Sequence, residues 1–293
     1  CMVLYTLPML WEVRMSPRLH AQVYGYFPHD WRQQVRQGGF RPVVFLGHGL
    51  WVAMFTCFAG ILSVAYLRAK KRIHPKIPPL ALVLYFAVVM VLCKSLGALV
   101  FLIMMTPVIL FLSYKNQLRV ASALAIIVFI FPFVRSQGLM PTKALTEYFL
   151  SIDEARAMSL KFRFDNEDIL LEKANIRPLF GWGTWGRNRV YDSRTGADLS
   201  VTDGYWIVAY GSIGWYGYVA ILGLHVIPII QISRRFKNSS ANSLGPYTPA
   251  LAIILAVNLA DLIPNDSLSI ISTLIAGALI GRCQNNELQT NKP

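Results

Sequence analysis

The sequence predicts an all-α fold, a polytopic bundle of transmembrane helices with one long polar loop that itself contains helices. Hydrophobic residues make up 55% of the 293 residues and charged residues only 15%. The apolar residues are gathered into long runs, and runs of about 18 or more residues with few charges are typical of membrane spans. One stretch, 135–204, instead carries ten Lys/Arg and ten Asp/Glu.

The elements follow from the order of apolar and polar stretches. Residues 1–10 are apolar and resemble the end of a span, so we expect the chain to be the C-terminal part of a longer protein. Inside the long loop, the near-helical spacing of apolar residues over 145–175 predicts helix, and a loop of this length is expected to fold. We expect spans at 43–67, 77–93, 95–113, 120–134, 205–232, 249–262 and 268–281.

Charge predicts the orientation of these spans. The connections that begin at Arg68, Lys115 and Arg234 are basic, and alternation of seven spans places them on one side with the C-terminal tail. That side carries twelve Lys/Arg and one acid, so the positive-inside rule makes it cytoplasmic. We expect transmembrane helices and a basic periplasmic loop (11–42) in 1–134, a periplasmic loop in 135–204, and C-terminal transmembrane helices with a cytoplasmic tail in 205–293.

Composition argues against two other classes of protein. The net charge of +13 could indicate a nucleic-acid partner, but basic cytoplasmic loops explain it and no nucleic-acid motif is present. The four cysteines, Cys1, Cys57, Cys93 and Cys283, form no C-x-x-C pair, so neither a disulfide framework nor a zinc site is expected. We expect no metal and no cofactor.

Candidate site residues gather on the predicted outer side. The basic loop carries Arg14, Arg18, Arg32, Arg36 and Arg41, which either anchor the chain to anionic headgroups or bind a ligand. His48 follows between two glycines, either as a satisfied structural histidine or as a functional one. Lys94, in a tight junction between two spans, either snorkels or neutralises a lipid-linked phosphate.

The long loop holds the other candidates. Arg163 and Arg177 precede glycines 181, 183 and 186, which would form either simple turns or a backbone nest for an anion. Asp203, at the mouth of a span, is either a helix N-cap or a general base. The aromatic residues Trp182, Trp185 and Tyr205 either belong to an interfacial belt or stack on sugar rings.

The order of these motifs resembles that of the superfamily of O-antigen ligases and of O-antigen and exopolysaccharide polymerases. The resembling stretch runs from about Arg41 to Gly217. It comprises Arg41-Pro42, Lys94-Ser-Leu-Gly97, Arg163, Arg177-Pro-Leu-Phe-Gly-Trp-Gly183, Asp203-Gly204 and Gly211-Ser-Ile-Gly214.

The resemblance implies a bacterial inner-membrane glycosyltransferase that works on the periplasmic face without a metal. Such enzymes transfer a glycan from undecaprenyl pyrophosphate to an acceptor glycan or lipid, with inversion at the anomeric carbon. The resemblance would make Lys94, Arg163, Arg41 and Arg177 pyrophosphate ligands, with Asp203 and His48 as catalytic residues. It would make Trp182, Trp185 and Tyr205 contacts for the glycan.

Two positions depart from the family pattern. Asp203-Gly204 stands where the ligases typically carry a histidine, and Lys94 stands where the junction usually carries arginine. The departures favour a divergent polymerase branch over a lipopolysaccharide ligase, and they leave an altered catalytic centre open. A transporter of lipid-linked glycans and a non-enzymatic scaffold for polysaccharide assembly are the alternatives from other classes.

Overall fold

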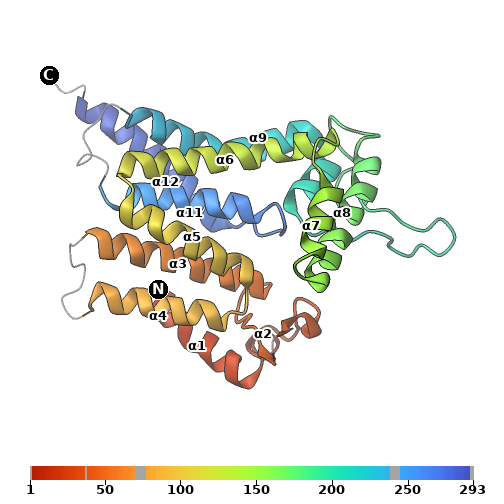
Figure 1. The fold of residues 1–293 in the computed structure, drawn as a ribbon, viewed down its shortest axis with the longest axis horizontal. Coiled ribbons are helices and arrows are strands. Elements are labelled where there is room, and N and C mark those ends of the chain that lie inside the picture. Colours follow the sequence, from red (N-terminus) through yellow and green to blue (C-terminus); the bar gives the residue numbers. More distant parts are fainter. Residues whose placement is uncertain (1, 37, 70–76, 238–244, 291–293) are drawn as a thin grey trace. The chain divides into compact units, whose positions relative to one another are not determined.

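The computed structural model of the chain describes residues 2–36, 38–69, 77–237 and 245–290. These residues form eleven α-helices and one short hairpin (Figure 1). Each predicted apolar segment contains a helix, which confirms the all-α fold, although the helix in the first segment begins at Gly49 rather than at residue 43. The helices concerned are α3 (Gly49–Ala69), α4 (Pro79–Leu92), α5 (Leu96–Phe111), α6 (Tyr114–Ser136), α9 (Tyr205–Arg235), α11 (Tyr247–Asp261) and α12 (Ile270–Thr290).

Three of these helices, α3, α6 and α9, are long and apolar enough to cross a membrane. Helices α4, α5 and α11, and the apolar part of α12 (Ile270–Gln284), are shorter than the roughly 20 residues that a typical hydrocarbon core requires. Only 33% of the most apolar window of α6 is buried inside the protein. The rest of the protein therefore leaves most of this apolar stretch uncovered.

The start of α6 differs from the sequence prediction. Residues Lys115–Arg119, expected to be a connection, form the first turns of the helix. Ser113 caps them, because its Oγ accepts the Asn116 N–H at 3.3 Å and its carbonyl accepts the Gln117 N–H at 2.9 Å. Helical hydrogen bonds do not need apolar side chains, so hydropathy alone places this boundary too late. The basic residues at 70–76 lie outside the described residues.

The chain divides into two compact units. Unit 1 comprises residues 1–121, 231–258 and 279–293, and in it α3 packs against both α4 and α5. Close approach of α3 and α5 depends on Gly60, because a Cβ there would lie 2.8 Å from a Leu102 methyl group. Small residues at helix contacts are the usual means of bringing membrane helices together.

The N-terminal part of unit 1 is held by one buried carboxylate. Glu12, in α1 (Met2–Met15), is fully buried and accepts three backbone N–H groups at 2.7 to 2.8 Å, those of Leu19, Val43 and Val44. It thereby ties α1 to the segment that leads into α3. The intervening elements are α2 (Leu19–Tyr24), the 3₁₀ turn η1 (Trp31–Gln34), β1 (Val35–Arg36) and β2 (Gly39–Phe40).

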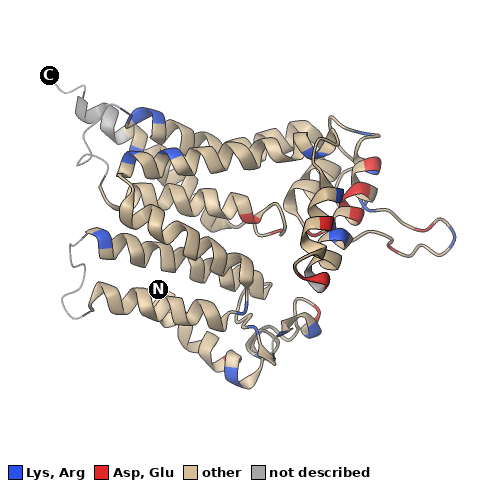
Figure 2. Ribbon diagram, in the orientation of Figure 1, with Lys and Arg blue, Asp and Glu red and all other residues tan. Residues whose placement is uncertain are grey.

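Unit 2 comprises residues 122–230 and 259–278. The helix predicted over 145–175 is two helices, α7 (Thr142–Leu150) and α8 (Glu154–Ala174), which pack against each other. Buried Arg135, near the end of α6, pairs with Glu167 at 3.1 Å and Asp168 at 2.7 Å and so holds α8. In Figure 2 acidic residues gather on α8, whereas the long helices carry little charge between their ends.

Candidate functional site

The basic loop before α3 folds into a hairpin. The Asp30 side chain accepts the Arg32 N–H at 2.9 Å and so starts η1. Strands β1 and β2 then pair antiparallel, Arg36 opposite Gly39. The Arg41 N–H donates to the Gln34 carbonyl at 2.8 Å, which closes the hairpin at its open end. The turn contains Gly38, whose positive φ of 68° few other residues adopt readily.

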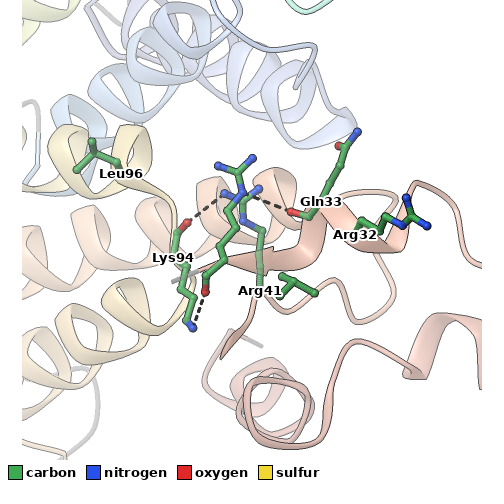
Figure 3. A pocket seen from close by; sticks show the side chains of 7 residues that line it. Arg32, Gln33, Arg41, Lys94 and Leu96 are labelled. Carbon is green, nitrogen blue, oxygen red and sulfur yellow. Dashed lines mark hydrogen bonds between the residues drawn. The ribbon is translucent and has the colours of Figure 1, made fainter. Parts of the chain in front are cut away.

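This hairpin and the junction between α4 and α5 line an open pocket of about 520 Å³ in unit 1 (Figure 3). Four of its seven lining residues are cationic and none is acidic. A pocket with this lining attracts an anion rather than a cation. The lining residues are Arg32, Gln33, Val35, Arg36, Arg41, Lys94 and Leu96.

Arg41 is the buried cation of this pocket, only 2% exposed. Its Nη2 donates to the Lys94 carbonyl at 3.0 Å, while its buried Nε has no partner among the described residues. Burial, and secondarily the charge of Arg36, lowers the Arg41 pKa from its ordinary value to about 10. The guanidinium therefore stays charged at neutral pH, although no carboxylate in the pocket lining compensates for it.

Space for this guanidinium depends on Gly49, the first residue of α3. A Cβ at that position would lie 2.3 Å from Arg41 Cδ and 2.8 Å from Gln34 Oε1. Of the two glycines that flank His48 in the sequence, Gly49 thus leaves room for the arginine side chain, whereas Gly47 lies against the Trp51 ring.

Lys94 lies at the turn between α4 and α5 with a positive φ of 49°. Its ammonium donates to the Arg36 carbonyl at 2.8 Å, so the lysine reaches across to the hairpin. A Cβ on Gly39 would come within 2.3 Å of this ammonium, so the ammonium lies close against the strand backbone. Figure 3 shows Arg41 and Lys94 side by side at the pocket.

His48 precedes α3 and acts as its cap. Its Nδ1 accepts the Leu50 N–H at 3.0 Å, so in the neutral ring Nε2 carries the proton. Burial, helped by His29 and nearby arginines, lowers the His48 pKa to about 4. The His29 ring lies edge-on at 4.6 Å. His48 is thus neutral at pH 7 with its basic nitrogen occupied, an arrangement that favours the structural interpretation over the catalytic one.

The other candidate residues belong to unit 2. Arg163, in α8, lies 3.6 Å from Asp203 Oδ2 through its Nε and donates to the Pro264 carbonyl through Nη1 at 3.1 Å. The two side chains are 39% and 41% exposed, so the pair is open to solvent. Arg163 is therefore engaged with Asp203, which it can orient. The adjacent Gly204 permits close packing, since a Cβ there would lie 2.1 Å from the Ile263 carbonyl oxygen.

The glycine-rich loop 177–186 is fixed to α9. The N–H groups of Trp182 and Gly183 each donate at 2.8 Å to the carbonyls of Gly211 and Ser212. Gly214 breaks the regular helix here, with φ 66° and ψ −170°. A Cβ on Gly214 would lie 2.3 Å from the Leu179 backbone, so glycine is required for this docking.

The aromatic candidates have different surroundings. The Trp182 ring contacts two cations, with its centroid 4.3 Å from the Arg177 guanidinium and 5.2 Å from the Lys173 ammonium, and its Nε1 donates to the Lys173 carbonyl. Trp185, in contrast, is 93% exposed at a positive φ of 63°. Tyr205 is half-buried at the start of α9. Of the three, Trp185 presents the most open face for stacking.

The predicted residues thus fall into two sets. Lys94 and Arg41 meet in unit 1, and Arg163 and Asp203 meet in unit 2, where Arg177 stacks on Trp182. Sequence reasoning did not single out Arg32 and Arg36 as pocket residues. The Gly38-Gly39 pair that follows Arg36 is typical of a hairpin turn, and it could have indicated that this segment folds back on itself. The sequence analysis also did not select Arg135, whose ion pairs fix α8 to the end of α6.

Comparisons of the chain with protein-family models, with curated proteins and with solved structures found no match. Over the residues that the structure describes, the chain is a helical protein with three helices of membrane-spanning length and apolar character, and a cationic pocket in unit 1.

Proposed function

We propose that this chain is a membrane glycosyltransferase that uses a glycan linked to undecaprenyl pyrophosphate as its donor. The motif order that resembles the O-antigen ligases and polymerases supports this function. The observation that carries it is the acid-free pocket around buried Arg41, which provides a binding site for the donor's pyrophosphate.

The charge balance of the pocket supports an anionic ligand. Burying a cation without a partner is costly, and such groups are usually paired with an anion or hydrogen-bonded. Arg41 keeps one buried nitrogen without a partner among the described residues, beside the guanidinium of Arg36 and the ammonium of Lys94. A pyrophosphate offers several oxygens to such donors, and charge-assisted hydrogen bonds to phosphate are among the strongest in proteins.

The reaction needs this kind of site. An acceptor hydroxyl oxygen attacks the anomeric carbon, the bond from that carbon to the pyrophosphate oxygen breaks, and the electron pair leaves with the pyrophosphate. Fixed cations would stabilise the negative charge that develops on the leaving group. The hydroxyl proton passes to a base, a role that the sequence resemblance gives to Asp203.

Binding is the first test. The full chain in nanodiscs should bind farnesyl pyrophosphate, a short analogue of the donor lipid, more tightly than farnesyl monophosphate, and farnesol least. Arg36→Ala and Lys94→Met should weaken binding of the pyrophosphate lipid, whereas Arg18→Ala, an exposed loop arginine outside the pocket lining, should not. Equal affinity for all three lipids would contradict the proposal.

Activity is tested separately. Cells that depend on this protein for surface polysaccharide should make shortened or unattached glycans with Asp203→Asn, while the purified variant still binds the pyrophosphate lipid. Normal glycans from a variant at wild-type membrane levels would remove Asp203 from the mechanism.

Transport of lipid-linked glycans is a second candidate, favoured by one observation. Helix α9 is interrupted at Gly214, and interrupted membrane helices are common at substrate sites of transporters. A transporter predicts that loss of function leaves undecaprenyl-linked glycan on the inner side of the membrane, whereas a transferase predicts that it accumulates on the outer side. Accessibility of the accumulated glycan to an added glycosidase distinguishes them.

A further inference from the structure

One stretch of the long loop exposes apolar side chains although it is tightly fixed. Ile176, Leu179 and Phe180 are exposed, Phe180 by 74%, and exposed Tyr216 on α9 stacks on Phe180 at 5.2 Å between ring centroids. We call these four residues the apolar wedge. The wedge is held by backbone hydrogen bonds, from the Trp215 N–H to the Pro178 carbonyl at 2.8 Å and from the Tyr216 N–H to the Leu179 carbonyl at 3.2 Å.

The length of α9 indicates the depth of the wedge. The helix has 31 residues and ends at Arg234 and Arg235. A hydrocarbon core of about 30 Å needs about 20 helical residues. Counting from the basic end, the far boundary of the core falls close to Gly214, where α9 is interrupted. Trp215 and Tyr216 therefore lie at the membrane interface, and so does the loop segment bonded to them.

Helix α6 gives independent evidence for the position of this edge of the hydrocarbon core. Phe133 of α6 contacts Trp215, with ring centroids 6.4 Å apart. Only two residues further along α6, Arg135 enters its ion pairs with α8, so the charged surface begins there. Aromatic residues flanked by the first charges are typical of the interface between lipid and water.

The wedge also continues the exposed apolar surface of α9. From Tyr216 the exposed side chains run along the helix through Val219, Leu224 and Ile227. The charge next to the wedge does not oppose contact with lipid, because the Arg177 guanidinium is turned onto the Trp182 ring.

We propose that the apolar wedge inserts into the interfacial region of the bilayer and contacts lipid. The glycine-rich loop is then a membrane-anchored element rather than a free loop. This inference rests on the geometry of unit 2 and is independent of the proposed function.

Site-directed spin labelling tests the proposal on the full chain reconstituted in liposomes. A nitroxide is attached at Phe180→Cys in a variant with Cys1→Ser and Cys283→Ser, since Cys57 and Cys93 are buried. Collision with oxygen, which concentrates in lipid, is compared with collision with a water-soluble nickel chelate. Leu224→Cys serves as the lipid reference and Leu199→Cys, exposed in the polar part of the loop, as the water reference.

The oxygen-to-nickel ratio at Phe180 should lie above that at Leu199 and shift toward that at Leu224, and Ile176→Cys should behave alike. A ratio equal to that at Leu199 would show that the wedge lies in water and would overturn the proposal. Protection of Phe180 from both reagents would overturn it as well, because a protein surface would then cover the wedge.

Discussion

Replacing Arg41 by methionine separates a binding role from a structural one. Methionine is of similar length and apolar, so it fills the buried position without the charge. If Arg41 holds the fold together, the variant will be less stable. If Arg41 exists to bind an anion, the variant will keep its stability and lose affinity for the ligand.

The expected stability change follows from two opposing quantities. Burial lowers the Arg41 pKa to about 10, which corresponds to about 3 kcal/mol of unfavourable free energy for the buried charged form. Methionine removes that cost. It also removes the hydrogen bond to the Lys94 carbonyl, and a hydrogen bond from a charged donor contributes about 1.5–3 kcal/mol. We expect the unfolding free energy to stay unchanged or to rise by about 1 kcal/mol.

The contribution of Arg41 to the stability of the fold depends on pH. Because folding lowers the Arg41 pKa, the folded chain releases this proton more readily than the unfolded chain. The unfavourable free energy of burying the charged guanidinium is therefore present in full below pH about 10. It disappears as the pH rises from about 10 toward the ordinary pKa of arginine. At neutral pH the comparison of Arg41→Met with the wild type measures the whole cost.

Affinity should change in the opposite direction. Loss of a charged donor to a phosphate oxygen costs about 2–3 kcal/mol, which weakens binding of farnesyl pyrophosphate about 30- to 150-fold. Melting temperature in detergent and calorimetric titration in nanodiscs measure the two effects, with exposed Arg18→Met as the control. A lower melting temperature together with unchanged affinity would refute this account of Arg41.

Three further substitutions test the surroundings of the site. Gly49→Ala places a Cβ 2.3 Å from Cδ of the buried Arg41 side chain, so it should weaken binding of the pyrophosphate lipid in the calorimetric titration. Gly97→Ala, whose Cβ would meet open space, is the control and should leave this binding unchanged. Glu12→Gln replaces a carboxylate oxygen by an NH2 group, which cannot accept the backbone N–H groups that Glu12 binds. The unfolding free energy should therefore fall by about 2–4 kcal/mol, and the melting temperature should fall with it. An unchanged melting temperature would show that the carboxylate does not hold this segment. Gly214→Ala should release the glycine-rich loop and speed its cleavage by trypsin, whereas Gly138→Ala, equally strained at positive φ but in open space, should cleave at the wild-type rate.

The helical architecture could be derived from the sequence because it depends on local properties. Long apolar runs fold as helices in lipid, since every backbone group must be hydrogen-bonded within the segment. The 3.6-residue periodicity likewise indicated the helices of the polar loop. Its division into α7 and α8 was not predicted, because the break at 151–153 contains neither glycine nor proline, although Ser151 and Asp153 are of residue types that favour turns and helix caps.

The site was only partly accessible from the sequence. Arg41 and Lys94 could be selected by type and position, since both sit where polar chain meets apolar chain. The roles of Arg32 and Arg36 depended on the hairpin that turns them toward the same pocket. The pairing of Arg163 with Asp203, 40 positions apart in the sequence, likewise required the fold, because no local pattern encodes a contact between distant segments.

The sequence by itself determined that this chain is helical, apolar over membrane-length stretches and basic at the ends of those stretches. Only the tertiary structure decided which cations share a pocket, which one is buried and which histidine merely caps a helix. The physical reason is that hydropathy and helix formation act over neighbouring residues. Burial, pKa and charge compensation are set by groups that folding brings together from distant parts of the chain.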